Sequence, residues 1–261
     1  MAFKKLMRAI GVGDPEVETV LHDPNVVPGG MLTGEVTVQG GTHHSRIEGV
    51  SLALKTRVEI ESGDDQYRSD MEYAKLPITG PFVLDERARR TFPFRFRVPW
   101  EAPLTHFYGQ PLYGTTVGLS TELAVAQAID ATDLDPVAVH PLPAQQRILE
   151  AFTSLGFRFR SADCEKGWIR GVHQELPFYQ EIEFLPPARY AHGIEQLEVT
   201  FVARPHSMDV VLEVDKRGGM FSEGHDSFST FTVDYGTVVG ANWEQQLDGF
   251  LQNAARRRGF L

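Results

Sequence analysis

Three aspartates close together in the sequence, Asp130, Asp133 and Asp135, are candidate ligands for Ca²⁺, which prefers carboxylate oxygens. Their spacing lacks the glycine and the terminal glutamate of an EF-hand loop. We therefore interpret them as polar residues of a turn that follows a strand. We expect no bound metal and no cofactor.

Cys164 is the single cysteine and the one candidate thiol nucleophile, with His173 as a possible base. Its acidic neighbours, Asp163 and Glu165, would raise the pKa of the thiol and so would not activate it. His43 and His44 are adjacent and would face opposite sides of a strand, so they could not chelate a metal together. The sequence therefore indicates a protein without catalytic residues.

The composition is that of an ordinary globular protein of 261 residues, with 42% hydrophobic residues and a net charge of −10. This length favours two domains, and the negative charge disfavours a nucleic acid as partner. A single cysteine excludes an internal disulfide and suits a reducing compartment. With no apolar run long enough to span a membrane and no signal peptide, we expect a cytoplasmic protein.

Apolar residues recur at every second position along much of the chain, which is typical of half-buried strands. A Pro-Gly turn leads into a strand over residues 31–38, which we interpret as the edge of a β-sandwich. Residues 50–60 give the clearest alternation, followed by a hairpin turn and a more polar return strand over 67–76. In residues 92–98 the apolar positions are Phe92, Phe94, Phe96 and Val98.

The second half repeats this organisation after a proline-rich connector that begins at residue 137. Pro143 and Gly156 flank a short helical pattern, and Asn242 is placed to cap a helix near the C-terminus. Residues 3–10 also have a helical pattern, with one apolar and one basic face. We predict an all-β fold of two antiparallel β-sandwich domains, residues 1–136 and 137–261, with short N-terminal, linker-proximal and C-terminal helices.

Several motifs give this chain a family resemblance. They are PGGxLxGEVTVxGG at residues 28–41, FPFRFRVPxxAPxT at 92–105, LGFRFRSADCEKG at 155–167, LPFYQEIEFLP at 176–186 and VVLEVDKRGG at 210–219. The chain resembles the bacterial sporulation-control protein M family, relatives of the arrestins. The resemblance implies an arrestin-like fold and a non-enzymatic regulatory or scaffolding role in sporulation or cell division.

Arrestin-like proteins resemble one another in having polar contacts between their domains, and sequence order brings six charged residues toward the predicted linker. These are Asp130, Asp133, Arg158, Arg160, Asp163 and Glu165. If they form buried ion pairs, removing one partner would cost about 3–5 kcal/mol and the cluster could hold the domain orientation. If they are solvated, they contribute little. The sequence leaves both alternatives open.

We expect this protein to bind other proteins through exposed sheet edges, because the backbone of an unpaired strand can accept a partner strand. The strand that carries Phe92, Phe94, Phe96 and Val98 is the candidate edge. The alternative is a membrane or trafficking adaptor that binds weakly to a membrane surface through the basic N-terminal helix, helped by the apolar loop over residues 100–113.

Overall fold

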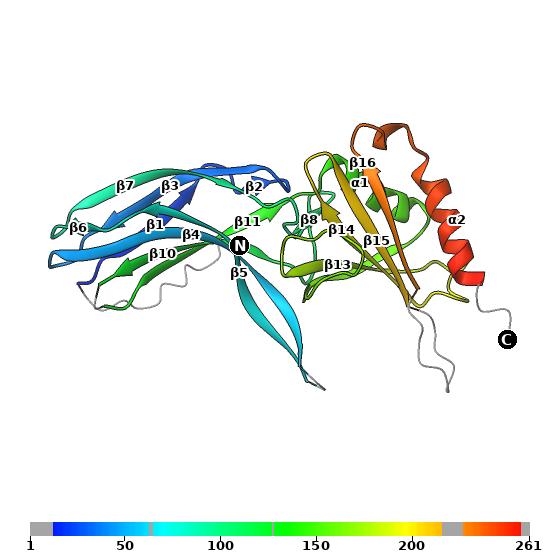
Figure 1. Ribbon diagram of the computed structural model, residues 1–261, viewed down its shortest axis with the longest axis horizontal. Helices are drawn as coiled ribbons and strands as arrows, with labels where there is room; N and C mark the ends of the chain where they lie inside the picture. Colours follow the sequence, from blue (N-terminus) through cyan, green and yellow to red (C-terminus); the bar gives the residue numbers. More distant parts are fainter. Residues whose placement is uncertain (1–12, 63–64, 127, 216–226, 257–261) are drawn as a thin grey trace.

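The structure is a computed structural model that describes residues 13–62, 65–126, 128–215 and 227–256. Its strands form two β-rich lobes that lie side by side (Figure 1). We call residues 13–139 the N-terminal lobe and residues 143–256 the C-terminal lobe. The predicted N-terminal helix over residues 3–10 lies outside the described residues.

The N-terminal lobe contains a three-stranded antiparallel sheet in the order β1-β3-β7. Its strands are β1 (Glu16–Leu21), β3 (Met31–Gln39) and β7 (Arg89–Arg97). Leu32, Val36 and Val38 of β3 are buried, as their alternation predicts. The prediction that this strand is an edge is wrong, because β3 pairs with β1 on one side and with β7 on the other.

A larger sheet continues from one lobe into the other in the order β16-β15-β14-β13-β12-β4-β10-β11-β2. In the N-terminal lobe it contains β2 (Asn25–Val26), β4 (Ser45–Ser62), β10 (Val117–Val125) and β11 (Ala131–Val139), with β5 (Asp65–Thr79) and β6 (Phe82–Leu84) paired to β4. A two-stranded sheet is formed by β8 (His106–Phe107) and β9 (Gln110–Pro111). Thus the lobes share backbone pairing.

The C-terminal lobe contributes five antiparallel strands to this sheet: β12 (Arg158–Lys166), β13 (Phe178–Leu185), β14 (Gln196–Ala203), β15 (Ser207–Asp215) and β16 (Ser227–Asp234). β12 joins the N-terminal lobe through one parallel pair, Glu165 with Glu59. The sequence pattern predicts strands over residues 157–160, 180–185, 194–202, 208–215 and 227–233, so each of the five is predicted, although β12 extends six residues further than expected. The all-β prediction is confirmed.

Two helices and a short 3-10 helix complete the C-terminal lobe: α1 (Pro143–Ser154), η1 (Val238–Gly240) and α2 (Trp243–Arg256). Pro143 begins α1, and Gly156 follows its end with φ +88°, a conformation that favours glycine. The Asn242 side chain accepts a hydrogen bond from the Gln245 N–H at 3.0 Å, which caps α2. None of the described helices is long and apolar enough to cross a membrane.

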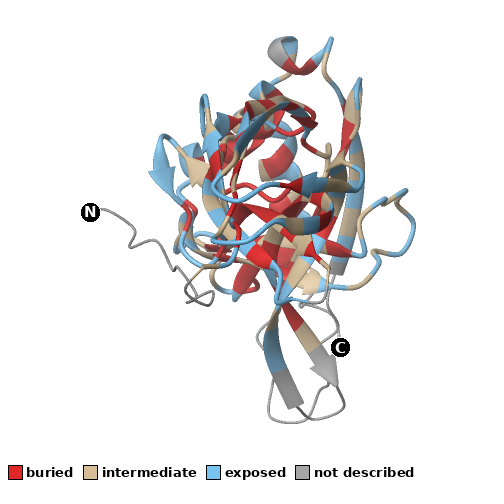
Figure 2. Ribbon diagram, turned by 90° about the vertical axis from the view of Figure 1, so that its left-hand side faces the viewer, coloured by how far each residue is buried: buried red, intermediate tan, exposed pale blue. Residues whose placement is uncertain are grey.

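The predicted domain boundary between residues 136 and 137 falls inside β11, which continues through Val139. The buried hydrophobic residues form one cluster with members in both lobes, and Figure 2 colours the buried parts of the ribbon red. At the junction, the ring of Tyr73 on β5 meets the ring of Phe178 on β13, with centroids 5.2 Å apart. The division into two domains therefore stays a prediction, and the lobes share an apolar contact.

β4 and β5 form a long hairpin that projects beyond both lobes (Figures 1 and 2). Cross-strand ion pairs line the hairpin, with Lys55 Nζ 3.0 Å from Glu72 and Arg57 3.5 Å from Asp70. These pairs are exposed and contribute little to stability.

We predict that Phe152→Ala destabilises the protein by about 3–5 kcal/mol, because its fully buried ring packs between Phe157 and Phe184 and its removal leaves a cavity. Urea denaturation measures the free energy of unfolding of each variant. The matched control is Phe228→Ala, whose ring is 64% exposed and whose loss should cost only about 0.5 kcal/mol. Equal losses in the two variants would contradict the placement of α1 on the core.

Candidate functional site

The six charged residues predicted to meet at the domain junction do not form one cluster. Asp130 accepts a hydrogen bond from the Val125 N–H at 3.0 Å, within the β10–β11 connection. Asp133 accepts one from the Thr19 N–H of β1 at 2.8 Å. Both aspartates therefore satisfy backbone donors inside the N-terminal lobe. Asp133 and Asp135 also lie within β11 and not in the turn that we expected.

The two arginines of the predicted cluster lie on β12 and are exposed. Arg160 is 3.5 Å from Glu183 on β13, and its guanidinium donates to the Gln196 side chain on β14. These partners belong to the C-terminal lobe, so Arg160 ties strands of one sheet together. Arg158 lies at the start of the same strand.

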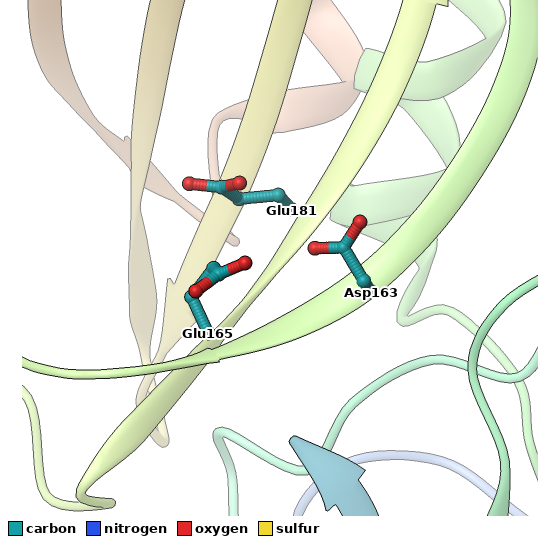
Figure 3. Close-up of side chains that lie close together, drawn as sticks. All are labelled: Asp163, Glu165 and Glu181. Carbon is teal, nitrogen blue, oxygen red and sulfur yellow. The ribbon is translucent and has the colours of Figure 1, made fainter. Parts of the chain in front are cut away.

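Asp163 and Glu165 converge instead with a carboxylate that the sequence analysis did not single out, Glu181 on β13 (Figure 3). One ligand atom from each of the three side chains lies within 4.8 Å of the other two. Alternation along β12 places both residues on the face opposite Cys164, and cross-strand register places Asp163 directly opposite Glu181. Three half-buried carboxylates thus share one small region of the sheet.

Burial and repulsion raise the pKa of two of these carboxyl groups. Burial first, and then the charges of Glu183, Glu165 and Glu59, raise the pKa of Asp163 to about 7. Burial first, and then Glu198, raise the pKa of Glu181 to about 9. The Oδ1 atom of Asp163 is buried and has no hydrogen-bond partner among the described residues. Near neutral pH, Glu181 is therefore mostly protonated.

A second group, Glu181, Glu198 and Glu213, also has its ligand atoms within 4.8 Å of one another. These carboxylates lie on the floor of a groove of about 1120 Å³ that extends over β12 to β16. Carboxylate oxygens suit Ca²⁺ or Mg²⁺, so both groups could offer ligands to such an ion. Clustered acids alone do not define a metal site, and we assign none.

A neutral side chain, Gln180 of β13, forms hydrogen bonds between the two lobes. Its Oε1 accepts from the Leu104 N–H at 2.8 Å, and its Nε2 donates to the Leu104 carbonyl at 2.7 Å and to Thr115 Oγ1 at 3.0 Å. Glu101 makes a second connection, accepting from the N–H groups of residues 175 and 176 at 2.8 and 2.9 Å. Hydrogen bonds to N-terminal-lobe loops, and not a charge cluster, connect the lobes here.

Gln180 is not among the residues predicted for the site, although its position in the sequence carries a signal. Phe178, Ile182 and Phe184 share its parity on β13 and are buried in the core. A polar residue at an apolar position of a strand needs buried hydrogen-bond partners. That mismatch could have marked Gln180 as a junction residue.

Cys164 is buried, and its pKa is raised to about 12, chiefly by burial. Its Sγ lies 3.9 Å from Thr56 Oγ1 of β4. The thiol is therefore protonated at neutral pH and unsuited to nucleophilic attack, as its acidic neighbours predicted.

The candidate interaction edge, β7, stands last in its sheet and pairs among the described residues with β3 alone. Phe94, Phe96 and Val98 are buried, with at most 5% of their surface exposed, and Phe92 is partly buried. A partner could not contact the three buried side chains without unfolding the core. What remains available on this edge is the backbone and the outward-facing side chains.

Comparison with known proteins supports the resemblance seen in the motifs. The family model described as SpoOM protein matches residues 3–218. The sporulation-control protein spo0M of Bacillus subtilis (strain 168) is 32% identical over 216 residues, covering 82% of this chain and 81% of that protein. The crystal structure of Spo0M from Bacillus subtilis matches with a TM-score of 0.81 at 28% identity, covering 93% of this chain and all of that one.

The curled, mostly antiparallel sheets and their junction define an all-β protein of the arrestin-like type. Within that class, this chain belongs to the SpoOM protein family. The predicted family and the predicted all-β fold class are confirmed.

We predict that Gln180→Leu weakens the connection between the lobes, because it leaves the Leu104 N–H and carbonyl without partners. Each unsatisfied buried group costs about 1–3 kcal/mol. Small-angle scattering should show a broader distribution of lobe arrangements, and thermal unfolding should show the lost stability. Arg160→Ala is the control, since both partners of this side chain, Glu183 and Gln196, lie in the C-terminal lobe and its removal should leave the contact between the lobes unchanged. If the scattering profile changes in Arg160→Ala and not in Gln180→Leu, the charged residues control the junction after all.

We also predict that the free energy of unfolding falls as the pH rises from about 5 to about 9. The fall should be larger in the unmodified protein than in a Glu181→Gln variant. The folded pKa values of Asp163 and Glu181, about 7 and about 9, lie above the ordinary values near 4. The folded state therefore holds protons that the unfolded state has released, and this advantage disappears as each folded group ionises. Melting temperatures across this range measure the effect. If the melting temperatures of the two proteins change with pH in the same way, the prediction of a raised Glu181 pKa is wrong.

Proposed function

We propose that this protein is a non-enzymatic regulatory scaffold that binds other proteins in the control of sporulation or cell division. Support comes from its membership of the SpoOM protein family and from a relative that is named a sporulation-control protein. The observation that carries the proposal is the outer backbone edge of β7, which pairs with no strand of the described parts of the chain.

The perturbed acids do not favour an enzyme. Burial is the first cause of the raised pKa values of both Asp163 and Glu181, and structural clusters of buried acids show such shifts without any catalytic role. The one thiol is buried and protonated.

Backbone geometry makes β7 suitable for an added strand. The Val98 N–H donates to the Gly30 carbonyl at 3.0 Å, just beyond the strand. Because bonding alternates along an antiparallel ladder, even-numbered residues of β7 bond to β3 and odd-numbered residues face away. The backbone groups of Thr91 and Arg95 are therefore directed outward, where a partner strand could pair with them.

The character of this edge favours an acidic partner segment. Three arginines, Arg89, Arg95 and Arg97, are exposed on a protein whose net charge is −10. Complementary charge would speed association and select the partner. Pro93 lacks an N–H, so one outward donor is missing from this edge. Backbone pairing alone is therefore weaker here, and a complementary charge on the partner becomes more important.

A photo-crosslinking residue introduced at Thr91 tests the proposal in the native cell. We expect a crosslinked partner protein, and we expect Arg95→Pro to reduce the adduct by at least about tenfold because proline removes an outward N–H. Arg95→Ala is the matched control, since it removes the same charge and keeps that donor, and its loss should be smaller. An adduct that persists in Arg95→Pro, with an unchanged melting temperature, would contradict strand addition at β7.

A further inference from the structure

The acidic groove lies on the face of the C-terminal sheet opposite α1. Phe184 of β13 packs on Phe152 of α1 with ring centroids 5.7 Å apart, and alternation turns Glu181 to the other face. The groove encloses about 1120 Å³ and receives side chains from five strands, the loop after β12, and Ile60 of β4. Its volume suits a peptide segment and far exceeds that of a single ion.

The carboxylates of the groove face one another across neighbouring strands. Glu198 is the register partner of Glu213, and Glu181 has as its register partner Asp163, which does not itself line the groove. Acidic side chains on neighbouring strands therefore give this face of the sheet a local negative charge that suits a cationic ligand.

Exposed aromatic side chains border the same carboxylates. Trp168 and Phe228 both line the groove, and each is 64% exposed. Phe228 is the register partner of Glu213, so an apolar ring and a carboxylate stand side by side. Large exposed rings beside acids suit a ligand that carries both apolar groups and positive charge.

We propose that this groove binds an extended basic segment of a partner protein. Lysine or arginine side chains would place their charges over Glu198 and Glu213 and lay their methylene stems along the aromatic rings. Lys166 and Arg170 line the groove in the stretch that carries Trp168, so the most acidic part lies over β13 to β15. This surface is separate from β7, so the inference goes beyond the proposed strand addition and does not depend on it.

The test measures the binding of a fluorescein-labelled peptide of about ten alternating arginine and leucine residues, enough to cross the five strands. Fluorescence polarisation with the full chain, at about 0.15 M salt to screen distant charges, gives the affinity. The variant Glu198→Gln with Glu213→Gln should bind at least about tenfold more weakly. Its melting temperature shows whether the double variant is folded, so that a loss of binding reports on the groove.

A matched double variant, Glu16→Gln with Glu48→Gln, changes the net charge equally at exposed positions outside the groove and should bind within about twofold of the unmodified chain. Phe228→Ser should also weaken binding. Equal losses in both double variants, or no binding by the unmodified chain, would overturn the inference. Ca²⁺ binding that depends on Glu198 and Glu213, without peptide binding, would overturn it too and assign the groove to a divalent cation.

Discussion

Side chains alternate between the two faces of a strand, and this constraint links the core of the C-terminal lobe to its acidic groove. On β13, Phe178, Ile182 and Phe184 point into the core. Glu181 has the opposite parity and must point to the other face. The apolar positions that hold the sheet on α1 therefore also decide where the carboxylates collect.

One position on β13 carries a polar group on the core side, and it lies where the lobes meet. Gln180 is an amide, so it can donate and accept at once and can satisfy both backbone groups of Leu104. A carboxylate there could not donate to the Leu104 carbonyl. The junction thus combines an apolar contact between Tyr73 and Phe178 with the neutral hydrogen bonds of Gln180, which avoid the desolvation cost that burial imposes on the Glu101 carboxyl group there.

Much of the fold could be predicted from the sequence, because period-two alternation and capping residues are local signals. The strands around Phe94 and Val199 and the helix that follows Asn242 all appear where these signals place them. β11 escaped prediction because Asp133 and Asp135 interrupt its apolar pattern, and strand order is not a local property, so β3 was misplaced at an edge.

The candidate site could be predicted less well, because it depends on register between strands that are distant in sequence. Nothing local indicates that Glu198 would lie opposite Glu213, or that Asp133 would bond to Thr19. Nearness to the linker in sequence suggested a charged junction, but tertiary pairing distributed those charges among separate partners. Only Asp163 and Glu165 remain together, and they meet Glu181.

The crowding of carboxylates on the outer face of the sheet is tested most directly by a carboxyl-carbon NMR titration of Glu181, assigned by its loss in Glu181→Gln. Burial and neighbouring charges predict a pKa of about 9. A midpoint near the ordinary glutamate value of about 4.3 would contradict the close approach of these acids.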